Sequence, residues 1–400
     1  MTSTAAFQRQ SASQANFARP RLYLGISGVG TAVLGATIFL TTGLAGRLLS
    51  TSDQQPLTLA LASLGATFLI IMFELLLFDM VGGALLVRHK RPLGQWFTPW
   101  LRGAGVQWCV WMGCAAVLMS VSRLGASASV GESVAATVGA FVLLQLLLAV
   151  LRGTFARLVS SMPVVPLSQP IQRAADQARL DPQRLVIVET SDEGFVGGFG
   201  GVHAGTSVMP SRFSMLSPPA LYAACVRRRV LAESGAHTRG VLGAVAWNAL
   251  GMSLVLALTG ASFASAAGTL VMMAGMTLWA FASVLLLPTV SRAAVFALDA
   301  QVTSECGAPA VRAAIEELDR WQDDEPARSR LVETIFHPVS ARTARIARLS
   351  TANPNGVRFW HAHHIARHAL WLSWATMSPI SRLVHCNVGR PALWVMLPGD

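Results

Sequence analysis

The sequence has little charge for its length. Of its 400 residues only 13% are charged, whereas about 25% is usual in soluble proteins. Its hydrophobic share is 53%, and its mean hydropathy is +0.50. This composition excludes an ordinary soluble protein and indicates a protein that lies in a lipid bilayer.

Lysine is also scarce, and the cysteines show no pattern typical of disulfides. Lys90 is the only lysine, so arginine provides almost all of the charge behind the net +11. The arginines cluster beside apolar stretches, which is typical of membrane orientation and not of a groove for nucleic acid. The five cysteines are an odd number, and Cys109 and Cys114 lie inside an apolar run. We therefore expect no nucleic-acid partner and no fold that depends on disulfides.

Six apolar stretches are long enough to cross a bilayer, which takes about 20 residues. They cover residues 22–45, 60–87, 104–121, 133–151, 242–264 and 268–289. The first is too long for a removable signal peptide and lacks the usual cleavage site, so it should remain as an anchor. The predicted fold class is mainly α, a polytopic α-helical membrane protein with about six spans.

The basic residues are distributed unequally between the loops. The N-terminal tail and the loop "RHKRPLGQWFTPWLR" at residues 88–102 hold seven of them, whereas the loops on the other side hold only Arg47 and Arg123. Because positive residues favour the cytosolic side, we expect both termini in the cytosol, in a bacterial inner (cytoplasmic) membrane.

The spans divide the chain into predicted regions. We expect a polar cytosolic tail at 1–21, a four-span membrane domain at 22–151, a cytosolic domain at 152–349 that contains a membrane hairpin at 242–289, and a C-terminal extension at 350–400. The hairpin returns the chain to the side that it left. The polar segments before and after the hairpin can therefore build one domain.

The first cytosolic segment has a readable order of elements. "LSQPIQRAADQARLD" has helical periodicity, "RLVIVETSD" is a buried-strand pattern, and "EGFVGGFGGVHAGTSVMPSRF" is typical of a glycine-rich hairpin or edge strand. A further helix follows, with Ser217 as N-cap and Pro218 in its first turn. After the hairpin another helical pattern is divided by Gly307 and Pro309.

This order resembles the integral-membrane zinc metallopeptidases of the CAAX prenyl endopeptidase and HtpX type. In that family a helix that opens with Leu-Ser-Pro carries H-E-x-x-H, and a membrane hairpin, an E-x-x-x-D helix and a Thr-His-Pro segment follow. This chain has "LSPPAL" at 216–221, "SRAAVFALDAQ" at 291–301 and "IFHPVSARTARIARL" at 335–349, and its loop at 88–102 is similar to a basic family loop. The resemblance implies a cytosolic zincin-like α+β peptidase domain interrupted by the hairpin.

The zinc-binding residues of the family are substituted. Aligned from the Leu-Ser-Pro motif, the two zinc histidines fall on Arg227 and Leu231, the catalytic glutamate on Arg228, and the third ligand on Val295. Arginine is only a donor and stays protonated, and leucine and valine have no lone pair to offer. The general base for a zinc-bound water is lost as well. We therefore expect a degenerate site with no catalytic residue, no metal and no cofactor.

The arginine triplet at 227–229 has two compatible explanations. It can mark the cytosolic end of a helix and contact anionic lipid headgroups. Alternatively, a guanidinium occupies the vacant metal pocket and pairs with Asp299, the carboxylate that remains from the motif. Consecutive helical residues point in different directions, so both can hold.

Other residues offer an alternative zinc site. Glu233 and His237 are four residues apart, and His361, His364 and His368 have the 3, 4 spacing of one helix face. Zinc would be a cofactor only under this alternative. The histidine-rich segment also contains tryptophans, so we expect an amphipathic helix on the cytosolic face of the membrane.

Two acidic residues and a glycine run complete the candidates. Glu74 and Asp79 lie in the second span, where acids are costly; we expect Asp79 to reach the interface near Arg88 and Glu74 to bond to a neighbouring helix. Gly197, Gly198 and Phe199 lie in the matching edge strand, which in the family takes up extended peptide.

Three functions follow from these observations. The first is a catalytically inactive metallopeptidase-like protein that binds a peptide or membrane protein without cleaving it. The second is an active zinc metalloendopeptidase with relocated ligands, and the third is a membrane scaffold or transporter.

Overall fold

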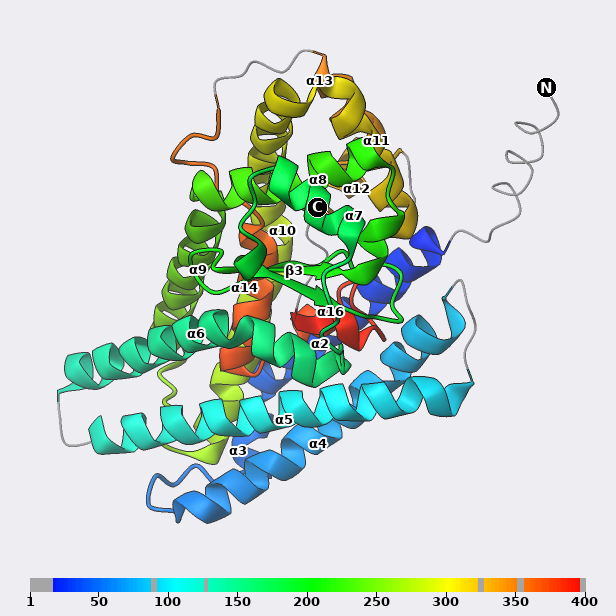
Figure 1. The fold of residues 1–400 in the computed structure, drawn as a ribbon. Helices are drawn as coiled ribbons and strands as arrows, with labels where there is room; N and C mark the ends of the chain where they lie inside the picture. Colours follow the sequence, from blue (N-terminus) through cyan, green and yellow to red (C-terminus); the bar gives the residue numbers. More distant parts are fainter. Residues whose placement is uncertain (1–16, 88–91, 126–128, 323–326, 351–355, 396–400) are drawn as a thin grey trace.

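The computed structural model describes residues 17–87, 92–125, 129–322, 327–350 and 356–395 (Figure 1). Most of the expected polar tail and the basic residues at 88–91, Arg88 among them, lie outside these described residues.

Long apolar helices dominate the described chain. Six of its helices are long and apolar enough to cross a membrane. They are α2 (Ala18–Thr42), α4 (Leu57–Met80) with the π-helical turn η1 (Val81–Leu85), α5 (Leu93–Leu124), α6 (Val130–Ser160), α9 (Ala236–Thr259) and α10 (Ala266–Cys306). Large apolar side chains such as Phe73 and Leu143 are 68% and 67% exposed on them, which suits contact with lipid. The six predicted spans are therefore confirmed as helices of an integral membrane protein.

Local sequence signals set several helix ends. A capping box between Ser129 and Glu132 opens α6. Gly235 precedes α9 and Gly307 follows α10, both with positive φ, and Pro309 lies in the first turn of α11 (Ala308–Trp321). The predicted break after the last span is therefore confirmed.

A small sheet lies beside the helices. The strands are β1 (Leu185–Val188), β2 (Gly198–Gly200) and β3 (Thr206–Pro210) in the order β1-β3-β2. β1 runs parallel to β3, with Val186 opposite Val208, and β2 runs antiparallel to it. The predicted buried strand and glycine-rich hairpin are therefore present.

Shorter helices complete the described chain before the C-terminal segment. α3 (Leu44–Leu48) packs against α2 and α10, and the others are α7 (Gln169–Gln177), η3 (Pro182–Arg184), η4 (Ser211–Met215), α8 (Pro218–Glu233), α12 (Arg330–Phe336) and α13 (Arg342–Leu349). α8 packs against α7, α10 and α11 over a core that includes Phe213, Leu231 and Leu298. The segments before and after the membrane hairpin are therefore in direct contact.

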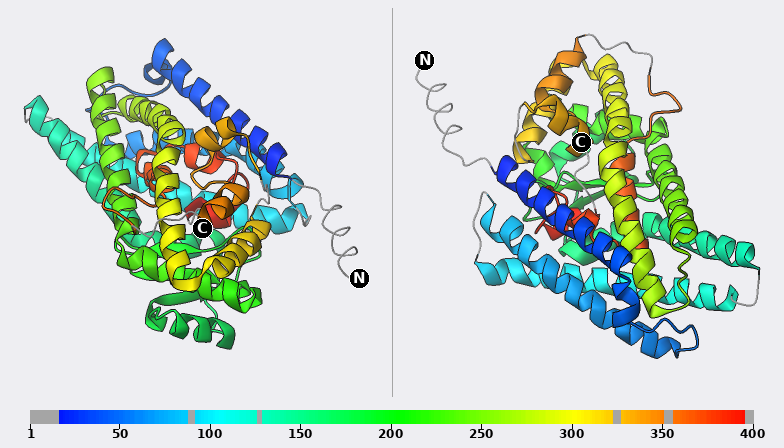
Figure 2. Two further views of the ribbon diagram at one scale, coloured as in Figure 1. Left: turned by 90° about the horizontal axis from the view of Figure 1, so that it is seen from above. Right: turned by 180° about the vertical axis from the view of Figure 1, so that it is seen from behind.

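The C-terminal segment, which we define as residues 361–395, lies inside the ring of long helices (Figure 2, left). It consists of α14 (Ile365–Leu372), η5 (Ser373–Thr376), α15 (Ile380–Leu383) and α16 (Pro391–Val395). α14 packs against α9 and α10, α15 against α2 and α4, and α16 against α5 and α6. All six long helices therefore contact this segment.

This position corrects the expected amphipathic helix at the membrane surface. Trp371, Trp374 and Trp394 are at most 1% exposed, and their segment is several short helices. An interfacial helix keeps one polar face in water, whereas these residues are enclosed on all sides. Periodicity in one segment cannot reveal that a ring of other helices has an interior to fill.

An ion pair between Asp79 of α4 and Arg382 of α15 holds the segment in place. Both side chains are 0% exposed, and Arg382 Nε donates to Asp79 Oδ2 at 2.7 Å. Trp100 Nε1 donates to the same oxygen at 2.9 Å, and the Gly389 amide donates to Oδ1 at 2.7 Å. Such a buried pair is tolerated only when the remaining polar atoms are also satisfied, as they are here for the carboxylate.

The surroundings of the two acidic residues of α4 differ from those that the sequence predicts. Asp79 faces the interior and not the membrane interface, because Arg382, 303 residues away, supplies its counter-charge. Glu74 is exposed on the opposite side of the same helix.

The ion pair yields a stability prediction. Arg382→Leu leaves the Asp79 carboxylate buried without a cation, which we expect to lower the free energy of unfolding by about 3–5 kcal/mol. Thermal unfolding of the purified chain in detergent measures the loss, and Asp79→Asn with Arg382→Leu should recover much of it. Glu74→Gln, on the exposed side of α4, is the control and should behave as wild type. An unchanged melting temperature for Arg382→Leu would show that the pair does not hold the segment.

Candidate functional site

The candidate site lies where α8 packs against α10. Pro218 opens α8 in its first turn, and the Ser217 side chain bonds to Glu317 of α11 (2.6 Å) instead of capping its own helix. This bond fixes the start of α8 beside α11. The expected N-cap position is therefore correct, but its side chain serves tertiary packing.

Asp299 of α10 is shared by two arginines. Arg227 of α8 donates to Asp299 Oδ1, and Arg345 of α13 makes two bonds to the carboxylate, at 2.9 and 2.8 Å. All three residues are at most 7% exposed. The pairing of Arg227 with Asp299 that the sequence suggested is thus present, and Arg345 adds a second guanidinium that the sequence did not reveal.

Arg228 points away from Asp299 and toward the sheet. It donates to the carbonyl oxygens of Val196 (2.7 Å) and Val208 (3.3 Å) and to Ser207 Oγ (2.9 Å). Its guanidinium also lies 5.5 Å from the ring centre of Phe213. It therefore ties α8 to β3 and to the segment that leads into β2.

Only the third arginine approaches the surface. Arg229 pairs with Glu305 and lies 4.0 Å from Glu233, whose side chain is 63% exposed. The explanation by lipid headgroups therefore does not apply to Arg227 and Arg228, which are buried in protein.

The two other positions that the sequence alignment predicts at the zinc site are apolar. Leu231 is 1% exposed and Val295 is 0% exposed. Arg227 and Leu231 are four residues apart on one helix face, as are Val295 and Asp299 on the other helix. The bond between Arg227 and Asp299 brings these two faces together, and no lone pair is available from the aliphatic side chains.

A histidine cluster lies next to this interface. His237, His363, His364 and His368 line a cavity of about 20 Å³ together with Arg152. Arg152 Nη1 lies 3.0 Å from His368 Nδ1. Because arginine can only donate, Nδ1 accepts and the proton of His368 is on Nε2. This cavity has room for about one water molecule.

Positive charge around the histidine cluster opposes metal binding. Burial, followed by the charge of Arg152 and the neighbouring histidines, lowers the pKa of His368 well below its usual value, so its ring is neutral. Arg228 and Arg367 also line the cavity and would repel a divalent ion. Within the described ranges, no group of three or more His, Cys, Asp or Glu is placed to hold a metal.

Of the alternative zinc ligands, His237, His364 and His368 lie together at this cavity, whereas Glu233 and His361 lie apart from it. His361 lies before α14, accepts a bond from the Arg358 amide (2.9 Å) and is half-buried outside the cluster. His364 has a left-handed φ of 53°, so His361, His364 and His368 do not share a helix face. Glu233 lies at the surface, while His237 is 3% exposed and bonds to the Gly201 carbonyl at 3.0 Å.

The glycine run forms an edge strand that is covered. β2 pairs only with β3, and Gly197, with φ of 83°, leads into it. Its outer side packs against α6, where the Gly201 amide donates to the Ala149 carbonyl at 3.2 Å. Phe199 is 6% exposed, and Gly198 is half-buried. The expected peptide-binding edge is therefore occupied by the chain's own helix.

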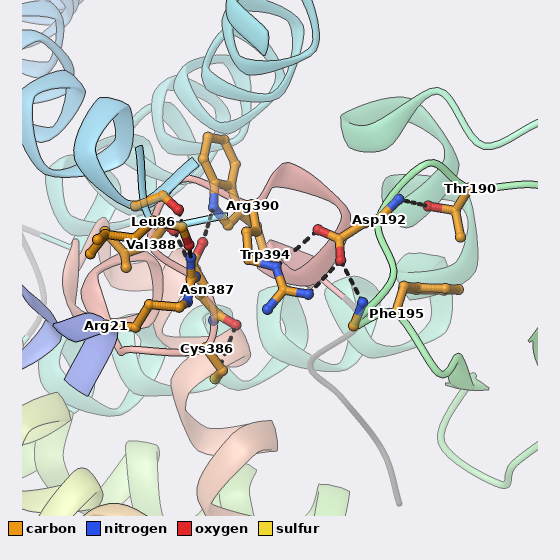
Figure 3. Close-up of polar contacts among 12 residues, drawn as sticks. Arg21, Leu86, Thr190, Asp192, Phe195, Cys386, Asn387, Val388, Arg390 and Trp394 are labelled. Atoms are coloured by element: carbon orange, nitrogen blue, oxygen red, sulfur yellow. Dashed lines mark hydrogen bonds and ion pairs between the residues drawn. The ribbon is translucent and has the colours of Figure 1, made fainter. Parts of the chain in front are cut away.

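Two further arginines that the sequence did not single out connect the C-terminal segment to its surroundings (Figure 3). Arg390 bonds to Asp192, with its Nε at 3.0 Å, and the Gly194 amide donates to Asp192 Oδ1 at 2.9 Å. Arg21 of α2 donates to the Val388 carbonyl at 3.1 Å and to the carbonyl of Leu86, the residue after η1, at 3.2 Å. Only the presence of basic residues near span ends could have indicated these contacts.

Comparison with protein-family models gives no match, and a search of curated proteins finds no similar sequence. The candidate site is therefore interpreted from its own residues and contacts.

Asp299 yields the second prediction. Asp299→Asn leaves Arg227 and Arg345 buried together without a counter-charge, and we expect a loss of about 3–5 kcal/mol in the free energy of unfolding. Glu305→Gln, on the same helix but at a partly exposed pair, should cost no more than about 1 kcal/mol. Melting temperatures of the full chain compare the two, and equal losses would contradict the special role of Asp299.

Asp192 yields a pH prediction. Burial alone would raise the pKa of Asp192, but Arg390, Arg21 and the Gly194 amide outweigh it and lower the pKa. A lowered folded pKa means that the stabilisation is present above the ordinary value of about 3.9 and is lost as pH falls through the folded value. Asp192→Asn should therefore be less stable than wild type at neutral pH and equally stable at the acid end. A melting-temperature difference that does not depend on pH would be the contrary result, and exposed Asp181→Asn is the control.

Proposed function

We propose that the protein is a catalytically inactive metallopeptidase-like membrane protein that acts by binding and not by hydrolysis. The observation that carries the proposal is the pairing of Arg227 with Asp299 between α8 and α10. A guanidinium occupies the position that a zinc ligand has in the related family, and the carboxylate of the E-x-x-x-D motif is its partner. We further propose that the sheet, α8 and α10 form a degenerate zincin-like domain.

The order and packing of elements support this proposal. A strand, a hairpin, a Leu-Ser-Pro helix, a membrane hairpin and a second helix follow one another, and the two helices pack side by side. The faces that meet contain Arg227, Leu231, Val295 and Asp299, the positions that the alignment with the family predicts.

The enclosed interior supports binding without cleavage. The cavity next to the α8–α10 interface measures only about 20 Å³, and α6 covers the outer side of β2. An extended peptide has no open edge to join there. We therefore propose a membrane component, either a lipid or another membrane protein, as the binding partner.

We also infer the orientation. Arg123, at the end of α5, donates to the carbonyl oxygens of Gln55 and Ala264, each at 2.8 Å, which gathers three interhelical connections at one face. These connections contain few basic residues, so we assign that face to the outside of a bacterial inner membrane and both termini to the cytosol.

Zinc content tests the proposal. The wild-type protein should retain no stoichiometric zinc and should not cleave membrane peptides, since Arg227 and Leu231 cannot ligate a metal. Combining Arg227→His, Leu231→His and Val295→Glu should create a site that takes up about one zinc per chain. Asp299 keeps Arg345 as its partner in this variant, so we expect it to fold.

The matched control replaces Leu231→His by Leu231→Ala in the same combination, and it should bind zinc much more weakly. Elemental analysis of the purified proteins gives the metal content. Stoichiometric zinc in the wild type with chelator-sensitive proteolysis would instead favour the alternative, an active metalloendopeptidase. Failure of the folded triple variant to bind zinc would contradict the proposed alignment.

A further inference from the structure

A larger cavity of about 310 Å³ lies between α2, α10 and the C-terminal segment. This volume is at the lower end of the range for small-molecule sites. Among the described residues this cavity shares only Arg367 with the lining of the histidine cavity, and its two ends differ in chemistry.

One end of the cavity is apolar and belongs to two membrane helices. Leu22, Ile26 and Val29 line it from α2, and Val284 and Leu285 line it from α10. Ile26 and Leu285 keep 41% and 36% of their surface exposed, so this end is accessible and not sealed. A hydrocarbon chain from the bilayer is the partner that such a surface favours.

The other end is basic. Five arginines line it, and among the described lining residues Asp319 is the only carboxylate. Those arginines are Arg328, Arg342, Arg345, Arg367 and Arg390. Some of them form ion pairs within the chain, such as Arg345 with Asp299, yet the arginines outnumber the acids around the cavity.

Two buried polar atoms at this end have no hydrogen-bond partner among the residues that the structure describes. They are Ser340 Oγ and His337 Nε2, in side chains that are 4% and 8% exposed. Buried polar atoms are nearly always bonded, so their position on a cavity wall points to a ligand or water that would bond to them. Burial lowers the pKa of His337, and the neighbouring His385, Arg328, Arg367 and Arg292 lower it further.

We propose that this cavity binds an anionic phospholipid, with the headgroup phosphate at the arginines and one acyl chain between α2 and α10. Arginine forms strong charge-assisted bonds to phosphate, and Ser340 and His337 add donors at the same end. A zwitterionic lipid would also bring the positive charge of its headgroup amine to a site that is already basic. The proposal does not depend on a relationship to peptidases.

Glycines of α2 provide a test that leaves the fold intact. A Cβ atom at Gly30, which lines the cavity, or at Gly35, which does not, would meet nothing within 4 Å. Gly30→Phe should therefore add bulk at the apolar end of the cavity, and Gly35→Phe is the matched control on the same helix. Arg328→Gln removes one charge from the basic end.

Native mass spectrometry and thermal unfolding of the full chain in detergent then compare three probes. These are phosphatidylglycerol, phosphatidylcholine with the same acyl chains, and inorganic phosphate. Wild type and Gly35→Phe should retain phosphatidylglycerol and melt at a higher temperature with it. Gly30→Phe should bind it about tenfold more weakly, and Arg328→Gln should reduce the preference over phosphatidylcholine.

Three results would overturn the proposal. Equal binding of both lipids would exclude recognition of the anionic headgroup. An equal shift with inorganic phosphate alone would indicate a site for free anions. Equal losses in Gly30→Phe and Gly35→Phe would show that the lipid binds outside the cavity.

Discussion

The ion pair between Arg382 and Asp79 determines how the interior of the protein is organised. Two charges with no exposure to solvent are stable only together, so the C-terminal segment must enter the ring of helices wherever Asp79 points. Once α15 is fixed there, α14 and α16 fill the remaining interior on either side of it. The cavity of about 20 Å³ at the histidine cluster is small because His363, His364 and His368 of this segment line it.

Arginines are used in the same way throughout the interior. Arg227 and Arg345 share Asp299, Arg228 binds a carbonyl oxygen of β3, and Arg21 binds carbonyl oxygens in and just after η1 and in the C-terminal segment. Guanidinium groups can bridge several acceptors at fixed angles, which suits joints between elements that are distant in sequence. Under the proposed resemblance to metallopeptidases, the pair of Arg227 with Asp299 stands where those enzymes hold a metal, and the proposed lipid site uses the arginines that line the larger cavity.

Sequence periodicity and turn residues predicted the local elements well. The six spans, the break at Gly307, the strand "RLVIVETSD" and the hairpin depend on patterns within one segment, and all of them are present. Asp299 as the partner of Arg227 was predicted as well, from the resemblance of the second helix to the E-x-x-x-D helix of the metallopeptidases. The place of the C-terminal segment was not predictable, since Asp79 and Arg382 are 303 residues apart and nothing local links them. The spacing of His361, His364 and His368 predicted one helix face, but the left-handed backbone of His364 keeps His361 outside α14.

A density map of the full-length protein in lipid nanodiscs, prepared with zinc in the buffer and resolved at side-chain level, is the most direct test of the central claim. We predict that Arg227 will pair with Asp299 between packed α8 and α10, that Arg382 will pair with Asp79 inside the ring, and that no ion will lie at either place. A metal coordinated between α8 and α10, or a C-terminal segment outside the ring, would contradict it.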